Sequence, residues 1–331
     1  MEPLLLLSFA VSFAVTYLLV PPWIRAARRI GLVGRDMNKY SRPEVAEMGG
    51  IAVVSGFVAG VLYYIALSTF YLKQDANLIY ILATLSTVLI ISIIGFLDDI
   101  LGWKIGLRQW QKPLLTLVAA LPMMAVNAGQ SSMVLPIFGT IDFGILYPLL
   151  IVPIGIAGAA NGFNMLAGYN GLEAGMGVII LSAMGFVAWQ SGSGWVAVLA
   201  GCMALALLAF LRYNWFPARV FPGDSLTYSV GALIACVAIL GNMEKLALVL
   251  FLPYFLDFLL PLRKRMKVEA FGKPQRDGSL EMPYNGIYDT AHVGLLILKK
   301  VKGRAYEYEV TLLILGVEAV IALLAVRWFL G

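Results

Sequence analysis

The chain has 331 residues, of which 60% are hydrophobic and only 13% are charged, and its mean hydropathy is +0.85. Soluble domains carry about 25% charged residues, so this composition excludes an ordinary soluble domain and indicates an integral membrane protein. The formal net charge is +5, but the basic residues form no soluble domain, so we expect no nucleic-acid partner. No internal repeat divides the sequence. We therefore expect one all-α transmembrane domain that covers residues 1–331.

Apolar runs recur along the chain and predict about ten membrane-spanning helices. We expect them at residues 3–21, 50–72, 78–97, 112–127, 144–160, 174–190, 195–211, 226–241, 246–262 and 310–330. Several runs are shorter than the roughly 20 residues that cross a bilayer alone, so their ends must be tilted or packed against neighbours.

Lys and Arg residues gather on one side of this predicted bundle. Of the 24 in the chain, 21 fall in the odd-numbered connections, and two, Lys73 and Lys245, fall in the even-numbered ones. Basic residues favour the cytoplasmic side, so we expect the odd connections in the cytoplasm and both termini outside. This face would attract anionic headgroups and anionic soluble ligands.

Two connections are longer than a turn. The outward stretch SSMVLPIFGTIDFG has two short β-prone runs around Gly139 and Thr140, so we expect a small β-hairpin there. Residues 263–309 form a long cytoplasmic loop. Its apolar and basic stretch AHVGLLILKKVKGR predicts an interfacial helix with Lys299, Lys300 and Lys302 at the polar end.

Asp98 and Asp99, in GFLDDILGWK, stand at the inner end of the third predicted helix. Such a pair can simply mark the membrane boundary. However, two carboxylates this close repel each other unless a cation is near, and Lys112 begins the next predicted helix. Carboxylates that face an oxygen-rich substrate are also how Mg²⁺ is usually held. The pair is therefore a candidate for catalysis.

The loop NGFNMLAGYNGLEAG supplies carboxamides instead of charges. Asn161, Asn164 and Asn170 fall between two apolar spans, and Gly168 lets the backbone approach a ligand closely. A single Asn in a loop is most often a turn residue. Three Asn in so short a loop favour a binding site.

RYNWFPARVFPGDSLTY is the third polar segment. Its prolines and Gly223 end one helix and the next begins at about Ser225, so Asp224 is partly a helix N-cap. A capping carboxylate leaves its second oxygen free, so Asp224 is also a candidate metal ligand.

With these motifs assembled, the chain resembles the polyprenyl-phosphate N-acetylhexosamine-1-phosphate transferase family of membrane enzymes. The resemblance covers nearly the whole chain and rests on the Asp pair, the NxxN loop, the FPxxVFxGD segment and the long final loop. Within the family, NGFNMLAGYNGLEAG is similar to the branch that makes dolichyl-diphosphate N-acetylglucosamine in eukaryotes and archaea. The bacterial peptidoglycan branch typically has Asp-Gly where this chain has Asn170-Gly171, and a His-rich motif in the last loop.

The resemblance implies a role for each matching residue. Asn164 and Asp224 would hold Mg²⁺, or Mn²⁺ in its place, and Asp98, Asp99 and Lys112 would be catalytic. The predicted substrate-binding residues are Glu47, Asn161, Gly168, Asn170, Arg276 and His292. Of these, Gly168 and Asn170 match positions near the uracil, and Glu47 matches the nucleotide end of the first loop. Arg276 and His292 are the sugar-binding candidates of the final loop, which shows no clear sugar-binding motif.

The reaction that these residues would support is phosphoryl transfer. Dolichyl or another polyprenyl phosphate attacks the β-phosphorus of UDP-N-acetylglucosamine, and UMP leaves. The second pKa of a phosphate monoester is about 6, so the nucleophile is already an anion and needs no strong base; whether Asp98 or Asp99 accepts a proton stays open. The product would begin lipid-linked oligosaccharide synthesis for protein N-glycosylation.

Two other functions fit parts of the sequence. A sister transferase would use another UDP-N-acetylhexosamine or undecaprenyl phosphate, for cell-wall or surface polysaccharide. A secondary transporter would need inverted repeats and acidic residues near the bilayer midplane, but no repeat is visible, and only Asp257 and Glu318 lie well within predicted spans. We expect the active site on the cytoplasmic face of a cell or endoplasmic reticulum membrane. The expected partners are both substrates, membrane lipids and a second copy in a homodimer.

Overall fold

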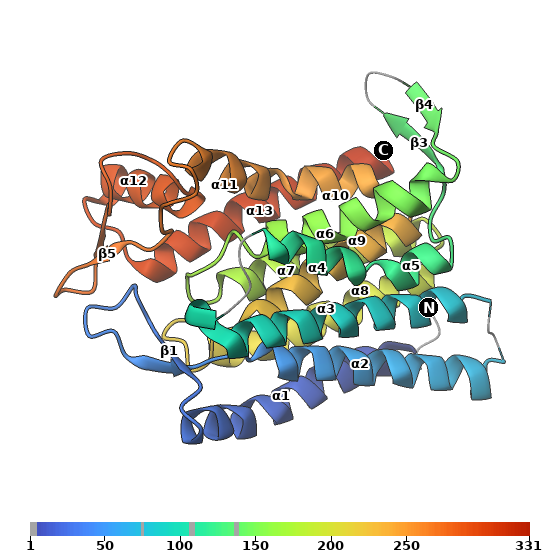
Figure 1. Cartoon of the computed structure of the whole chain (residues 1–331), viewed down its shortest axis with the longest axis horizontal. Coiled ribbons are helices and arrows are strands. Elements are labelled where there is room, and N and C mark those ends of the chain that lie inside the picture. Colours follow the sequence, from blue (N-terminus) through green and yellow to red (C-terminus); the bar gives the residue numbers. More distant parts are fainter. Residues whose placement is uncertain (1–4, 74–75, 106–109, 136–138) are drawn as a thin grey trace.

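The computed structural model describes residues 5–73, 76–105, 110–135 and 139–331. In this part of the chain the long helices run alongside one another in one bundle (Figure 1). The helices are α1 (Leu6–Arg29), α2 (Gly50–Ala66), η2 (Leu67–Tyr71), α3 (Leu78–Ile105), α4 (Gln111–Val118), α5 (Leu121–Ala125), η3 (Tyr147–Ile151), α6 (Val152–Phe163), α7 (Leu172–Gln190), α8 (Gly194–Asn214), α9 (Asp224–Leu240), α10 (Glu244–Leu250), α11 (Leu252–Leu262), α12 (Thr290–Lys302) and α13 (Glu307–Leu330). The strands are β1 (Val33–Arg35), β2 (Glu44–Ala46), β3 (Ser132–Leu135), β4 (Gly139–Asp142), β5 (Lys273–Pro274) and β6 (Leu280–Glu281).

Among the described residues, 6 helices are long and apolar enough to cross a membrane: α1, α2 with η2, α3, α7, α8 and α13. The pair α10 and α11 is bent by 53° and makes a seventh if it is one span. Two more apolar helices, η3 with α6 and α9, are shorter. The chain is therefore a polytopic helical membrane protein, but the predicted count of about ten spans is not confirmed.

The predicted single helix at 112–127 is instead two short helices. α4 ends at Val118 and α5 begins at Leu121, with Pro122 in its first turn. A proline has no backbone N–H and cannot continue the hydrogen bonding of a preceding helix, so it favours a break at this point. The sequence did contain this signal, but the apolar run around it concealed the break.

Helix α9 lies at the centre of the bundle. Every residue from Ser225 to Ile239 is buried, and the helix packs against α3 and α6. Glycine makes the second contact close: a Cβ at Gly231 would lie 2.4 Å from the carbonyl oxygen of Ala159 on α6. A helix that is buried all round has an apolar surface on every side, which explains why it can be short and still be integral to the bundle.

The two ends of the bundle differ (Figure 1). The β1–β2 and β5–β6 pairs and α12 lie at one end, and β3, β4 and both chain termini lie toward the other. β3 and β4 pair antiparallel with Leu135 opposite Gly139, in the segment predicted to be a hairpin; its turn, residues 136–138, lies outside the described residues. Residues 3 and 4 of the first predicted span, and Arg108 among the basic residues counted above, also lie outside them.

The predicted interfacial helix is present as α12, and Asp289 caps it by accepting a hydrogen bond from the backbone of Ala291 (2.7 Å). Its last turn carries Lys299, Lys300 and Lys302, which oppose the negative end of the helix dipole. The placement of α12 on the membrane surface stays a prediction.

Candidate active site

The start of α9 is held by a carboxylate from α3. Asp99 Oδ1 accepts a hydrogen bond from the backbone N–H of Asp224 (2.8 Å), and Oδ2 accepts one from Ser225 (3.2 Å). The first N–H groups of a helix have no partner within it, so this carboxylate satisfies two of them at the positive end of the dipole. Gly95 makes the approach of α3 feasible, because a Cβ there would lie 2.6 Å from the carbonyl carbon of Asp224.

Lys112, at the start of α4, joins two carboxylates from other helices. Its Nζ lies 2.6 Å from Oδ2 of Asp98 on α3 and 3.1 Å from Oδ2 of Asp224 on α9. Burial disfavours the ammonium, but the charge of Asp224 and the hydrogen bond with Asp98 outweigh this effect, so the pKa of Lys112 is raised. The sequence had suggested that Lys112 separates Asp98 from Asp99. In the structure it separates Asp98 from Asp224, and Asp99 has turned to the backbone of α9.

Asp224 lines a polar cavity of about 350 Å³. Its wall contains six of the predicted site residues: Glu47, Asp99, Asn164, Gly168, Asn170 and Asp224. Asn164 ends α6, and its Oδ1 accepts a hydrogen bond from Thr227 Oγ1 of α9 (2.6 Å). Three segments far apart in the sequence therefore place oxygen atoms on one cavity.

Glu47 reaches the cavity because its segment pairs with the segment before α9. The N–H of Phe221 donates to the carbonyl of Ala46 (2.7 Å), and the N–H of Gly49 donates to the carbonyl of Phe221 (2.9 Å). Burial, and secondly the charge of Asp224, raise the pKa of Glu47 above its ordinary value. The raised pKa is the electrostatic sign that several carboxylates share this small volume.

One part of the cavity wall contains Gly168 and an aromatic ring. Gly168 has a φ of +96°, which favours glycine, and a Cβ there would lie 2.9 Å from Cε1 of Phe271. The N–H of Gly168 donates to Glu173 Oε1 (3.0 Å). Gly168, Phe271 and Glu173 all line the cavity, so an aromatic ring and a carboxyl group flank Gly168 in this wall.

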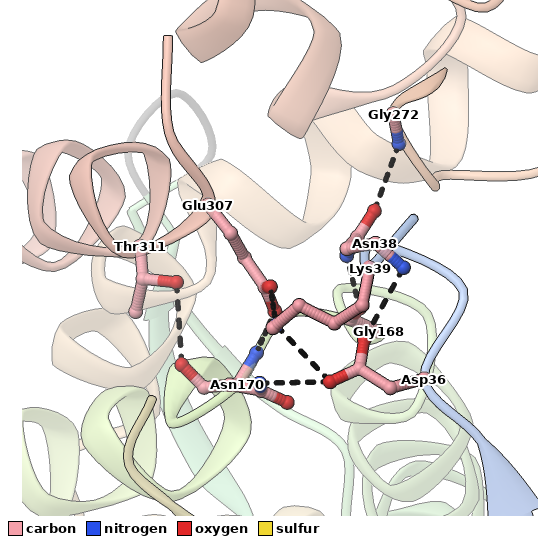
Figure 2. Close-up of polar contacts among 8 residues, drawn as sticks. All are labelled: Asp36, Asn38, Lys39, Gly168, Asn170, Gly272, Glu307 and Thr311. Carbon is pink, nitrogen blue, oxygen red and sulfur yellow. Dashed lines mark hydrogen bonds and ion pairs between the residues drawn. The ribbon is translucent and has the colours of Figure 1, made fainter. Parts of the chain in front are cut away.

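A largely buried polar network adjoins this wall, and two of its members, Asp36 and Asn170, also line the cavity (Figure 2). Lys39 forms ion pairs with Asp36 (3.1 Å) and Glu307. Asn170 donates its backbone N–H to Glu307 Oε1 (2.8 Å) and its side-chain amide to Asp36 Oδ2 (3.1 Å). The amide nitrogen of Asn170, predicted to lie near a base, is thus engaged by the protein itself.

Three other predicted residues lie elsewhere. Asn161 donates to Thr116 Oγ1 (2.8 Å) and lines a second pocket. Arg276 is exposed and contacts the hydroxyl of Tyr40 (3.3 Å). His292 is fully buried in α12, and burial lowers its pKa. Among the described residues that line the polar cavity, neither Arg276 nor His292 is present.

The second pocket is an apolar groove of about 500 Å³ between α4, α6 and α11. Its lining residues are Pro113, Leu117, Ile154, Ala157, Gly158, Asn161, Gly162, Met165, Phe251, Tyr254, Phe255 and Phe258. Lys112 is not among the described residues that line the cavity or the groove. It pairs with Asp224, which lines the cavity, and it directly precedes Pro113, which lines the groove. One lysine therefore lies next, in contact or in sequence, to a residue of each pocket.

Sequence reasoning missed the polar network and the aromatic wall. Asp36 and Lys39 lie in a short loop, Glu307 at the start of α13, and Phe271 in the long last loop. No sequence motif marks any of these residues as part of a site. The one available signal was that DMNK places an acid and a base three residues apart in an otherwise unremarkable loop, which is weak because most such pairs are solvated.

The donor atoms of the cavity suit a hard cation only in combination with a substrate. In the described part of the chain, no three His, Cys, Asp or Glu side chains are grouped as a metal site. Asp224 and Asn164 nevertheless contribute a carboxylate and a carboxamide to one cavity. Mg²⁺ is commonly bound by one or two carboxylates together with substrate phosphates and water, so this donor set fits it.

Comparison with known proteins relates this architecture to membrane transferases. Residues 81–242, which include Asp98, Lys112, Asn164 and Asp224, match glycosyl transferase family 4. A Saccharolobus solfataricus protein, provisionally named UDP-N-acetylglucosamine–dolichyl-phosphate N-acetylglucosaminephosphotransferase, is 35% identical over 97% of this chain and 96% of its own length.

Two further relatives cover about three quarters of the chain. The UDP-N-acetylglucosamine–dolichyl-phosphate N-acetylglucosaminephosphotransferase of Dictyostelium discoideum is 29% identical over 74% of this chain and 68% of its own length. A phospho-N-acetylmuramoyl-pentapeptide-transferase of Halalkalibacterium halodurans is 30% identical over 76% of this chain and 79% of its own length. Both named activities transfer a phosphorylated amino sugar.

Proposed function

The chain belongs to glycosyl transferase family 4, and we propose that it transfers N-acetylglucosamine 1-phosphate from UDP-N-acetylglucosamine to dolichyl phosphate or a related polyprenyl phosphate. The products would be lipid-diphospho-N-acetylglucosamine and UMP. Two relatives that bear the dolichyl-phosphate name support this choice of substrates. The observation that carries the proposal is the position of Lys112, which pairs with Asp224 of the polar cavity and directly precedes Pro113 of the apolar groove.

The apolar groove is the proposed site of the lipid acceptor. Its wall is mostly hydrocarbon and aromatic side chains, including Phe251, Tyr254 and Phe258. A polyprenyl chain can exchange bilayer hydrocarbon for this apolar wall without meeting water, and its phosphate would then lie near Lys112. The bend of 53° between α10 and α11 lies along this wall.

The polar cavity is the proposed site of the nucleotide sugar. The ring of Phe271 beside Gly168 offers a face on which a planar base can stack, and Asp224 and Asn164, which also line the cavity, are the proposed phosphate-binding residues. Those two residues would hold Mg²⁺, which when bound neutralises charge on a diphosphate. Glu47 also lines this cavity and is close enough to Asp224 for their charges to interact.

The proposed chemistry needs little proton transfer. An oxygen of the lipid phosphate forms a bond with the β-phosphorus, and the bond from that phosphorus to the bridging oxygen breaks, so the electron pair leaves with UMP. The nucleophile is already an anion. The chain then mainly positions the two phosphates and neutralises charge, and the candidate cations are Lys112, shared by Asp98 and Asp224, and Arg35, which lines the cavity.

The same proposal fixes the orientation in the membrane. We place the end of the bundle that carries β1, β5 and α12 in the cytoplasm, because the basic connections lie there and UDP-sugars are soluble anions. The product would then form on the cytoplasmic face and serve lipid-linked oligosaccharide synthesis.

A sister activity is the competing proposal, because relatives of this chain also include a phospho-N-acetylmuramoyl-pentapeptide-transferase. Purified protein incubated with radiolabelled UDP-N-acetylglucosamine and either dolichyl or undecaprenyl phosphate separates the two. We expect organic-extractable label with dolichyl phosphate, and less with undecaprenyl phosphate. Efficient use of UDP-N-acetylmuramoyl-pentapeptide, with no use of UDP-N-acetylglucosamine, would favour the sister activity.

A further inference from the structure

Three distant segments of the chain meet at the half-buried ammonium group of Lys39, two of which are drawn in Figure 2. Lys39 of the first loop pairs with Asp36 (3.1 Å) and with Glu307 at the start of α13. The same Nζ lies 4.3 Å from the ring centroid of Phe216, in the segment before α9. The side chains of Asp36 and Glu307 are only 5% and 2% exposed. Ion pairs this buried are held in place by the cost of leaving a charge without a partner.

The ion group holds Asn170 by three bonds. The backbone N–H of Asn170 donates to Glu307, its side-chain amide donates to Asp36, and its carbonyl accepts from Thr311 Oγ1 (3.3 Å). Asn170 is 4% exposed. The loop between α6 and α7 is therefore fixed to α13 and to the first loop at the same residue.

Asn38, the neighbour of Lys39, fixes the cavity wall itself. Its Nδ2 donates to the carbonyl of Gly168 (2.9 Å), and its Oδ1 accepts from the N–H of Gly272 (3.0 Å). One side chain thus sets the distance between Gly168 and the segment that carries Phe271. Gly168 and Phe271 pack closely against each other and both line the polar cavity.

We propose that Asp36, Lys39 and Glu307 form a clasp that sets the width of the nucleotide end of the cavity. This rests on the proposed function, in which Phe271 and Gly168 receive the base. Lys39 and Glu307 do not line the cavity among its described residues, so they are positioning residues. They would affect binding of the nucleotide sugar indirectly, through the positions of Asn170 and Asn38.

The charges of the clasp explain why residue 170 is an uncharged hydrogen-bond donor. Asp36 and Glu307 carry two negative charges against one positive charge on Lys39. A carboxylate at 170 would add a third negative charge and remove the amide that donates to Asp36. Asn170→Asp should therefore open the clasp. Combining it with Asp36→Asn restores a donor and an acceptor across the same contact, with the total charge unchanged.

The first test separates donor binding from chemistry. Because a wall displaced by about 1 Å can cost up to roughly 100-fold, we expect Lys39→Met to raise the KM for UDP-N-acetylglucosamine by about 10- to 100-fold. The kcat and the KM for the lipid phosphate should stay close to wild type. Lys39→Arg should recover part of the loss, since a guanidinium also pairs with two carboxylates. Lys300→Met removes an exposed lysine of α12 and is the matched control.

The second test uses the exchanged pair and a readout that does not need turnover. UMP affinity, measured by calorimetry, should fall in Asp36→Asn and in Asn170→Asp and recover in the double variant. Hydrogen exchange of amides 166–172 should accelerate in both single variants and slow again in the double. Unchanged exchange and unchanged UMP affinity in the single variants, or no recovery in the double, would overturn the clasp. If wild-type protein binds no UMP, the proposed function fails, and exchange alone still decides whether the clasp exists.

Discussion

At the scale of single residues, the site depends on which carboxylate each cation neutralises. Adjacent letters in the sequence suggested that Asp98 and Asp99 act as a pair. The structure divides them, because neighbouring residues on a helix point about 100° apart. Asp98 faces Lys112 and Asp224, while Asp99 faces the amides of α9. The chemistry assigned to the pair therefore has to be assigned to Asp98, Lys112 and Asp224 together.

Lys112→Ala should lower the transfer rate at saturating donor and lipid. Loss of one charge-stabilising group typically costs roughly 100- to 1000-fold in kcat, and here it would also leave Asp98 facing Asp224 without a cation. Single-turnover rates measure the effect, with Lys300→Ala as the surface control. Lys112→Arg should restore only part, because a planar guanidinium does not replace a compact ammonium. A rate near wild type in Lys112→Ala would remove this residue from the site.

Asn164→Ala and Asp224→Asn should raise the Mg²⁺ concentration needed for half-maximal activity, since each removes a proposed oxygen ligand. Thr227→Val is the matched control, because it removes the hydrogen bond to Asn164 Oδ1 and two weaker ones to the carbonyls of Gly223 and Asp224, but no proposed metal ligand. Binding of Mn²⁺, followed by electron paramagnetic resonance in the presence of UMP, provides a readout separate from turnover. Equal metal dependence in all four proteins would contradict the metal assignment.

Glu47 provides a test by pH. Its pKa is raised above the ordinary 4.5 by burial and then by Asp224, so folding favours the protonated carboxyl. This contribution to stability is fully present below pH 4.5 and is lost as the pH rises through the raised value. The melting temperature of Glu47→Gln minus that of wild type should therefore increase as the pH rises from 4.5 to neutrality. The exposed Glu44→Gln is the control, and a difference that does not vary with pH would argue against the burial of this charge.

At the scale of helices, the site requires α3 and α9 to approach very closely at Gly95. The backbone of Asp224 occupies the space that any larger residue at Gly95 would need. Because Asp98 and Asp99 lie one turn further along α3, the same contact sets their distance to the start of α9. The packing contact between α3 and α9 therefore also determines the geometry of the site.

Gly95→Ala should lower stability and activity together. The added Cβ meets backbone atoms at 2.6 Å, so one helix must move, and overpacking of this kind costs about 1–3 kcal/mol. Gly155→Ala on α6 adds the same atom where nothing lies within 4 Å, at a position that lines neither the cavity nor the groove, and it should be neutral or slightly stabilising. Thermal melting in detergent and turnover of both variants decide the matter. Equal behaviour of the two variants would show that the close contact is not required.

At the scale of the whole molecule, the sequence predicted the class of fold better than its details. Hydropathy is a local property, so the helical regions around residues 50–72 and 172–190 could be found from composition alone. The break in 112–127 and the bend between α10 and α11 were not predicted, although Pro122 and Pro253 stand in the first turn of the second helix in each case, because long apolar runs surround both prolines.

The same limit applies to the site. Glu47, Asn164, Gly168 and Asp224 were identified from motifs, and the structure brings them to one cavity. Phe271 and Lys39 could not be found in this way, because their importance arises only when loops far apart in the sequence meet. Arg276 and His292 were chosen for their residue type alone, and they lie away from the cavity.

The predicted orientation is testable by cysteine labelling. Arg276→Cys and Gln130→Cys are both at exposed positions, whereas the native Cys202 and Cys236 are buried. A membrane-impermeant maleimide applied to intact cells should label Gln130→Cys only, and Arg276→Cys should react after the membrane is opened. The reverse pattern would place the basic end of the bundle outside.

The central claim is transfer of the phosphosugar, and the fate of the β-phosphate tests it most directly. Purified protein is incubated with dolichyl phosphate and UDP-N-acetylglucosamine that carries ³²P in the β-phosphate. We expect the label to enter the organic-extractable lipid while unlabelled UMP appears in equal amount. Labelled UDP in the aqueous phase, together with an unlabelled glycolipid, would show transfer of the sugar alone and contradict the proposed reaction.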